Sequence, residues 1–100
     1  MRAIFNYAGG MKIYVRPEHT LKAAIFILDV ESSDLIESVK DKIVKIEGIP
    51  SKYEILMFNG KILHDGKTLS DYNIVDGSTI SLTVNESFHL IFGPDGGFHG

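Results

Sequence analysis

Cysteine is absent from all 100 residues of the sequence. The chain therefore forms no disulfide, offers no thiolate ligand to a metal ion and has no thiol nucleophile. This composition is consistent with an intracellular protein, because disulfides are used mainly in oxidising compartments.

The chain also lacks an excess of basic residues and any long apolar run. Lys and Arg number 10, Asp and Glu 13, and the formal net charge is −3. A nucleic-acid surface normally needs a basic patch, so we expect no nucleic-acid partner. No apolar run approaches the roughly 20 residues of a membrane span, and the start of the chain has no signal-peptide pattern. We therefore expect a protein of the cytoplasm or nucleus with no membrane partner.

The hydrophobic content of 44% suffices for one small core and not for two. Paired glycines at positions 9 and 10 indicate a flexible joint, and a turn-rich segment begins at Gly93. We therefore expect residues 1–10 to be a flanking segment, or the tail of a preceding repeat, before a domain that begins at Met11.

One amphipathic helix is predicted after Ser33. Asp34, with Glu37 three residues later, has the pattern of a capping box. Apolar residues then recur at helical spacing and predict one buried face, made of Ile36, Val39, Ile43 and Ile46. Gly48 and Pro50 end the helix after about 13 residues.

Five segments have the composition of strands: 11–16, 24–30, 54–58, 61–63 and 79–84. The first alternates so that Tyr14 points outward and its apolar neighbours face the core. Asn59-Gly60 suits a type I′ turn between the third and fourth segments, because both residues tolerate positive φ. In the polar loop 68–74, three side chains are spaced to anchor the loop on the core: Leu69, Tyr72 and Ile74.

The centre of the chain resembles the ubiquitin family. The matching segments are Gly48-Ile49-Pro50, Gly60-Lys61, Asp65-Gly66 and Thr68 through Ile74, and from Val30 to Leu82 a little over half of the positions match. The resemblance implies an α+β fold of the β-grasp type, a mixed sheet of about five strands wrapped on one amphipathic helix. In that fold the first and last strands pair in parallel at the sheet centre. The resemblance also implies that the domain spans 11–86 and that 87–100 form a C-terminal extension with a diglycine.

The resemblance also implies an exposed apolar patch on the sheet that binds other proteins. The matching positions are Met57 and Thr83, with Gly60 at the rim, and methionine suits an adaptable binding surface. Ile49 and Val84 would form a second, smaller patch, and Tyr14 a third contact. The alternative is that Met57 is merely an exposed strand methionine.

Three lysines match positions through which ubiquitin builds chains: Lys61, Lys40 and Lys42. Lysines on a helix or beside a turn are most often plain solvated charges, which is the alternative interpretation.

The family's C-terminal tail, with its arginines and two terminal glycines, is replaced here by residues 85–88 (Asn-Glu-Ser-Phe). A diglycine occurs later, at Gly96 and Gly97. Ile4-Phe5-x-x-x-Gly9-Gly10 has the same pattern as Ile91-Phe92-x-x-x-Gly96-Gly97. Because a diglycine directly before Met11 resembles the junction of head-to-tail precursors, residues 11–97 could be a processed unit; the alternative is coincidence.

No residue set supports catalysis, a cofactor or a metal site: the four histidines show neither ligand spacing nor a triad arrangement. The leading hypothesis is a monomeric domain that binds ubiquitin-binding or proteasome-associated proteins. The alternative is a modifier that a processing protease releases after Gly97 and that conjugating enzymes join to lysines. A bacterial or viral mimic is a third interpretation.

Overall fold

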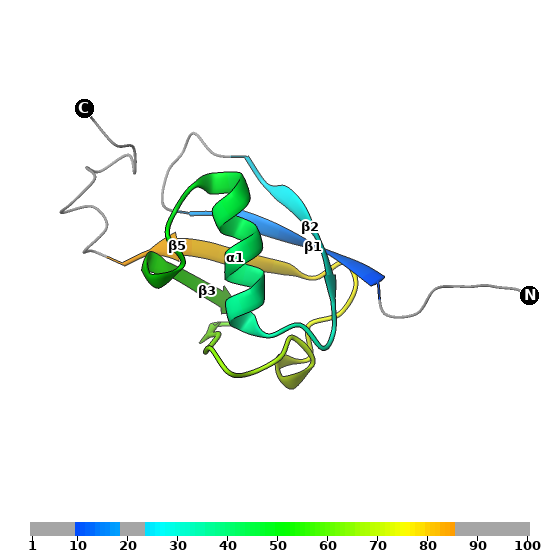
Figure 1. The fold of residues 1–100 in the computed structure, drawn as a ribbon. Helices are drawn as coiled ribbons and strands as arrows, with labels where there is room; N and C mark the ends of the chain where they lie inside the picture. Colours follow the sequence, from blue (N-terminus) through cyan, green and yellow to red (C-terminus); the bar gives the residue numbers. More distant parts are fainter. Residues whose placement is uncertain (1–9, 19–23, 86–100) are drawn as a thin grey trace, which may run out of the picture.

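The structure, a computed structural model, describes residues 10–18 and 24–85. One helix lies across a five-stranded sheet (Figure 1). The strands are β1 (Gly10–Pro17), β2 (Phe26–Glu31), β3 (Glu54–Phe58), β4 (Lys61–Ile62) and β5 (Thr79–Val84). The α-helix is α1 (Ile36–Glu47), and two short 3₁₀ turns are η1 (Ser51–Tyr53) and η2 (Ser70–Tyr72).

The strand order is β2-β1-β5-β3-β4. β1 and β5 pair in parallel at the centre, with Tyr14 opposite Thr79, and the other three pairings are antiparallel. Since parallel neighbours need a long crossover, α1 and the strands after it occupy the connection between β1 and β5. This arrangement confirms the predicted α+β β-grasp fold.

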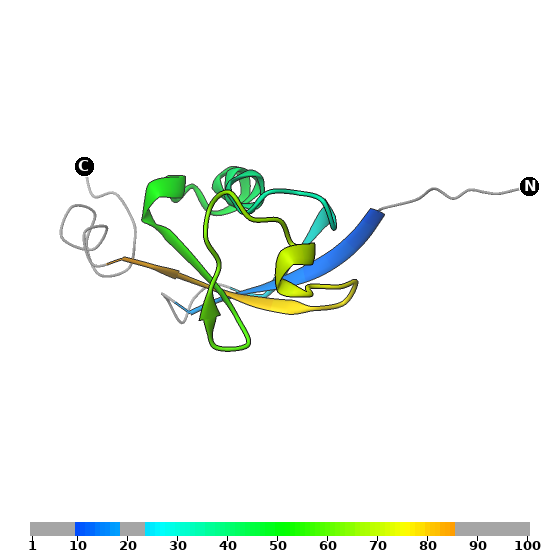
Figure 2. The ribbon, with the colours of Figure 1, turned by 90° about the horizontal axis from the view of Figure 1, so that it is seen from below.

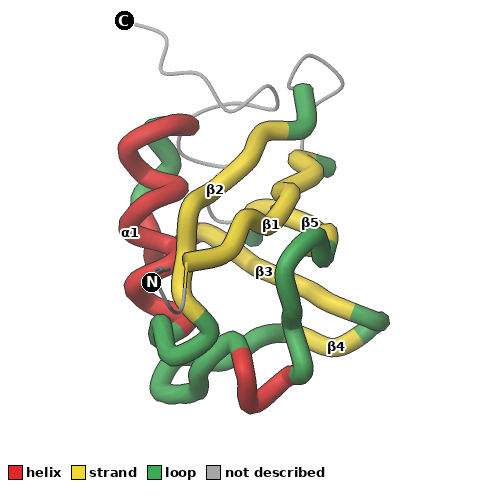
Figure 3. Tube along the Cα trace, turned by 90° about the vertical axis from the view of Figure 1, so that its right-hand side faces the viewer, coloured by secondary structure: helices red, strands yellow, loops and turns green. Residues whose placement is uncertain are grey.

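Helix and sheet form two layers. Seen from below, α1 lies on one side of the sheet (Figure 2), and the strands curve past it in the view from the side (Figure 3). The space between the layers is filled by aliphatic side chains that are almost wholly buried: Ile13, Val15, Leu28, Val30, Ile36, Val39, Ile43, Leu56, Leu63, Leu69, Ile74, Ile80 and Leu82. The period-2 alternation in β1 and β5 puts every second residue into this core, as predicted.

The predicted capping box is wrong. Leu35 precedes the helix, and no side chain caps its first turn. Asp34 Oδ2 instead accepts a hydrogen bond from the Glu31 N–H at 3.0 Å, and Glu37 Oε1 accepts one from the Gly66 N–H at 2.8 Å. Both carboxylates are drawn away from the helix because neighbouring loops present N–H groups of their own.

The end of the helix agrees with the sequence except at Ile46. Gly48 adopts a left-handed conformation with φ of 76°, and its N–H donates to the Val44 carbonyl at 2.8 Å. Ile46 was expected on the buried face but is 50% exposed. It lies in the last turn at the edge of the apolar stripe, beyond Ile43, so the core covers it only in part.

Two loop predictions are confirmed. Asn59 and Gly60 both have positive φ, 52° and 77°, as the tight turn between β3 and β4 requires. In the loop after β4, Leu69 and Ile74 are buried, while the half-buried Tyr72 uses its hydroxyl to accept a hydrogen bond from the His64 N–H at 2.9 Å. β1 begins at Gly10, one residue before the predicted strand, and continues to Pro17, where a break was expected.

Candidate protein-binding face

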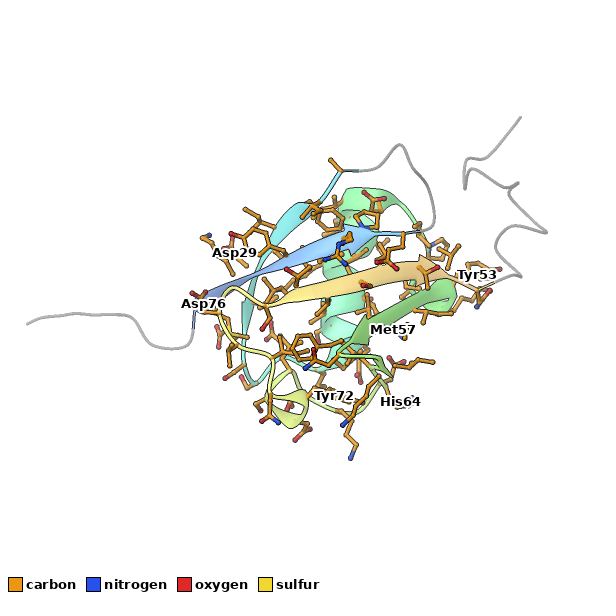
Figure 4. The ribbon with its side chains drawn as sticks, turned by 180° about the vertical axis from the view of Figure 1, so that it is seen from behind. Asp29, Tyr53, Met57, His64, Tyr72 and Asp76 are labelled. Carbon is orange, nitrogen blue, oxygen red and sulfur yellow. The ribbon has the colours of Figure 1, made fainter. Side chains whose placement is uncertain are left out.

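The sheet face that points away from α1 contains the predicted patch residues. Figure 4 looks onto this face, with the helix behind the sheet and Met57 labelled on β3. Met57 is opposite Ser81, and Ile55 is opposite Thr83. Met57 and Thr83 are therefore diagonal neighbours on adjacent strands, and both are partly buried.

Two further apolar side chains belong to this surface and were not predicted. Ile62 of β4 is opposite Met57 and is 49% exposed, whereas Ile55 on β3 is partly buried. The two-residue turn fixes the hairpin register, so the sequence contained the signal that Ile62 would face outward beside Met57. We call the side chains Ile55, Met57, Ile62 and Thr83, with Gly60 at the rim, the Met57 patch.

A polar group borders the Met57 patch along the centre of the sheet. Ser81 Oγ donates to Glu18 Oε2 at 3.2 Å, and Arg16 Nη1 lies 3.4 Å from the same oxygen. The Glu18 N–H also donates to the Leu82 carbonyl at 2.7 Å. These contacts hold Glu18, at the end of the described part of this loop, beside the patch.

Ile49 and Val84 do not form the expected exposed patch. They lie together as predicted, but they are 3% and 7% exposed and pack with Tyr53 in a small cluster separate from the main core. Val84 has an inward position in the alternation of β5, and Ile49 follows the turn at Gly48. Their contribution is to the packing of the domain, because little of either side chain is left for a partner.

Tyr14 lies on the same outer face at its other side. It is opposite Ile27 of β2, and Tyr14, Ile27 and Ile25 are all exposed. The polar group of Arg16, Ser81 and Glu18 lies between this set and the Met57 patch, since β1 and β5 are the central strands. The outer face thus carries two separate apolar areas.

The three candidate chain lysines have different surroundings. Lys61 is exposed beside the tight turn. The side chain of Lys40 is only 14% exposed, and its Nζ lies 3.0 Å from Asp65 Oδ1. Lys42 donates to the Asp29 carbonyl at 2.7 Å. The candidate conjugation glycines, Gly96 and Gly97, lie outside the described residues.

Glu54 is an unusual side chain that the sequence analysis missed. It is 3% exposed, and neither carboxyl oxygen has a hydrogen-bond partner among the described residues. Burial raises its pKa to about 8, against the lowering effect of nearby Lys40. The signal was present in the sequence, because Glu54 occupies the same inward phase of β3 as Leu56.

Within residues 10–18 and 24–85, no group of three or more histidine or acidic side chains is arranged to hold a metal ion. In the same part of the chain, no helix combines the length and apolar content needed to cross a membrane.

Comparison with known proteins gives related sequences of very different lengths. Ubiquitin D of Rattus norvegicus is 41% identical over 59 residues, which are 59% of this chain and 37% of that protein. NEDD8-like protein 2 of Dictyostelium discoideum is 39% identical over 64 residues, 64% of this chain and 80% of that protein. AN1-type zinc finger protein 4 of Mus musculus is 40% identical over 65 residues, 65% of this chain and 9% of that protein.

The chain thus spans little more than a third of the ubiquitin D relative, but most of the NEDD8-like one. The Ubiquitin family matches residues 13–87, which include all but the first residues of β1 and the whole of the helix and remaining strands. The strand order, the parallel central pair and the family match agree with one another. The chain belongs to the ubiquitin family.

Proposed function

We propose that this chain is a protein-interaction domain that binds components of the ubiquitin and proteasome system through the Met57 patch. It would do so as a monomer of the cytoplasm or nucleus, without catalytic chemistry. The observation that carries the proposal is the grouping of Ile55, Met57 and Ile62 on an exposed sheet face. Isolated exposed apolar residues are common, but three neighbours on one face form a surface that a partner can cover.

The chemistry of this surface suits a helix or loop of a partner protein. Met57 has an unbranched, polarizable side chain that can adapt to different apolar surfaces. Beside it, the ion pair of Arg16 with Glu18 and the hydroxyl of Ser81 supply charged and hydrogen-bonding groups. Apolar contact would provide affinity, while the polar border would orient the partner and select among partners.

The test is the substitution Met57→Glu, measured as the Kd for a panel of purified ubiquitin-binding modules. A charge at the centre of an apolar contact should weaken binding by about tenfold or more, because the carboxylate must lose its water without gaining a partner. Far-ultraviolet circular dichroism should be unchanged, since Met57 lies outside the core.

The matched control is Ile27→Glu, which places the same charge on an exposed aliphatic residue in the other apolar area of the same face. This variant should keep the wild-type Kd. Equal affinities for wild type and Met57→Glu, or equal losses in both variants, would contradict the assignment to the Met57 patch.

The match to AN1-type zinc finger protein 4 supports a fixed domain. The aligned region is only 9% of that protein, so a related sequence occurs there as a small part of a longer chain. The chain also departs from the ubiquitin tail at residues 85–88, which an activating enzyme that reads arginines should not accept.

A second candidate function is a modifier that is released after Gly97 and conjugated to lysines. It is favoured by the match to NEDD8-like protein 2, of which 80% is covered. On this hypothesis, Gly97→Ala blocks attachment to substrates in cells, since the channel around a diglycine tail excludes side chains. Wild-type adducts in that variant would rule out the modifier, and their loss would favour it over the fixed domain.

A further inference from the structure

Glu54 opens β3, directly opposite Val84 of β5. It is the one buried polar or charged side chain among the described residues, and both of its carboxyl oxygens lack a hydrogen-bond partner there. Buried polar groups in native proteins are nearly always hydrogen-bonded, so an unpartnered carboxyl at this position calls for a physical explanation.

The charged groups around Glu54 do not supply a free partner. Glu54 is one of the residues that line a shallow hollow of about 420 Å³, together with Lys40, Ile55, Ile62, Leu63, His64 and Asp65. α1 contributes one cation and two anions to its surroundings: Lys40, Asp41 and Glu47. Lys40 is engaged by the Asp65 carboxylate at 3.0 Å, and β5 has no titratable side chain from Thr79 to Val84. In η1, which precedes Glu54 in the chain, Lys52 Nζ lies 5.2 Å from the centre of the Tyr53 ring.

A carboxylate in these surroundings is costly. Removing a charged group from water without a partner requires far more free energy than binding a proton, so the group stays neutral instead. Burial is the largest cause that raises the pKa of Glu54, to about 8, with the anions Asp41 and Glu47 adding to it and Lys40 opposing it. Burial in the folded domain thus favours the neutral form of the Glu54 carboxyl.

We propose that Glu54 is a proton-operated latch, which keeps the start of β3 packed under α1 while its carboxyl is neutral and loosens this junction when the proton leaves. The ionised carboxylate has two ways to find a partner. Lys40 can exchange Asp65 for Glu54, which would release the loop after β4 from α1. Alternatively, water can enter, which requires the start of β3 to separate from the helix.

The sign of the effect follows from linkage. The folded domain holds the proton up to a pH of about 8, whereas the unfolded chain releases it near the ordinary glutamate value of 4.5. The folded state therefore binds more protons between these values, and the free energy of unfolding decreases as pH rises across this window. The stabilising contribution of the neutral Glu54 carboxyl is fully present below pH 4.5 and is lost as pH rises through about 8. Within this window, the folding equilibrium constant changes by at most about tenfold per pH unit.

The experiment measures denaturant unfolding of the full chain at intervals from pH 5 to pH 9 for wild type and Glu54→Gln. Glutamine has nearly the same shape but cannot ionise. The wild-type folding constant should decrease by roughly a few hundredfold between pH 5 and pH 8, and the slope should be largely absent from the variant. His64 lines the same hollow and is kept unchanged in every variant.

Glu31→Gln is the control, because Glu31 is exposed at the end of β2. It should reproduce the wild-type profile. Parallel profiles for wild type and Glu54→Gln would overturn the proposal. If Glu54→Gln fails to fold, the proposal is tested by a carbon-13 NMR titration of the Glu54 carboxyl in the wild-type chain. A titration midpoint above pH 7 supports the latch, and a midpoint near pH 4.5 overturns it. Neither measurement depends on the partner of the Met57 patch.

Discussion

The two faces of the sheet differ in the burial and the polarity of their side chains. The face toward α1 is a continuous layer of buried aliphatic residues, broken at the start of β3 by Glu54. The face toward solvent alternates apolar and polar groups, with the Met57 patch on one side, Tyr14 and Ile27 on the other, and the ion pair of Arg16 and Glu18 between them.

This difference separates stability from recognition. An inner residue contacts many neighbours at native packing density, so its loss leaves a cavity. An outer residue is partly hydrated already, so its loss costs the fold little but removes part of a surface that a partner can contact. Leu56 and Met57 are consecutive in β3 and point to opposite faces, which makes them the sharpest test of the distinction.

The largest expected effect on stability is that of Leu56→Ala. The side chain is completely buried between sheet and helix, so truncation should lower the free energy of unfolding by about 2–5 kcal/mol. Urea unfolding followed by circular dichroism measures the loss. Met57→Ala is the control and should change the value by no more than about 0.5 kcal/mol. Similar losses in the two variants would remove the distinction between the faces.

A smaller effect is expected where α1 ends. Gly48 has φ of 76° and nothing within 4 Å of the position that a Cβ would take, so Gly48→Ala should cost about 1 kcal/mol through backbone conformation alone. Gly48→Asn should cost less, because asparagine tolerates the left-handed region. If both variants unfold at the wild-type urea concentration, the turn does not depend on glycine.

A weaker effect should appear only in acid. Asp71 Oδ2 accepts a hydrogen bond from the Thr68 N–H at 2.9 Å, and this bond is the main reason that the pKa of Asp71 lies below its ordinary value of 3.8. Its stabilising contribution is therefore present above pH 3.8 and is lost as pH falls through the lowered value. Asp71→Asn should lose less stability than wild type between pH 4 and pH 2 in urea unfolding. Identical acid slopes would show that the exposed loop bond does not contribute.

The smallest effect is expected at Ile46, in the last turn of the helix. Ile46→Ala should change the free energy of unfolding by at most about 0.5 kcal/mol, since half of that side chain is exposed. Ile43→Ala, one turn earlier and fully buried, should lose about 2–5 kcal/mol. A large loss at Ile46, measured in the same urea experiment, would mean that the helix end packs more tightly than its exposed fraction indicates.

Most of the fold could be predicted from local patterns. The strand-like composition of 54–58 and the alternation in 79–84 predicted β3 and β5 with their observed bounds, and Asn59-Gly60 predicted the turn with its positive φ values. The capping box was predicted wrongly because Asp34 and Glu37 can accept hydrogen bonds from N–H groups outside the helix as well as from its first turn. The tertiary fold brings the N–H groups of Glu31 and Gly66 close to these two carboxylates.

The candidate site was predicted in part. Met57 and Thr83 lie on one outer face as expected, but Ile62 was missed although the hairpin register implied its position. Ile49 and Val84 were assigned to the surface, and their burial depends on the packing of Tyr53 against them, which involves segments apart in sequence.

The sequence by itself determined the elements, their order and the family, because alternation, helical spacing and turn residues act over a few neighbouring positions. Only the tertiary structure decided which of these residues remain accessible and which ionisable groups lose water. Lys40 and Lys61 read alike in sequence, yet one is held against Asp65 and the other is exposed. Glu54 was not distinguished from its neighbours in the sequence, and its pKa is raised because α1, β5 and the loop after β4 leave its carboxyl buried, without a hydrogen-bond partner among the described residues.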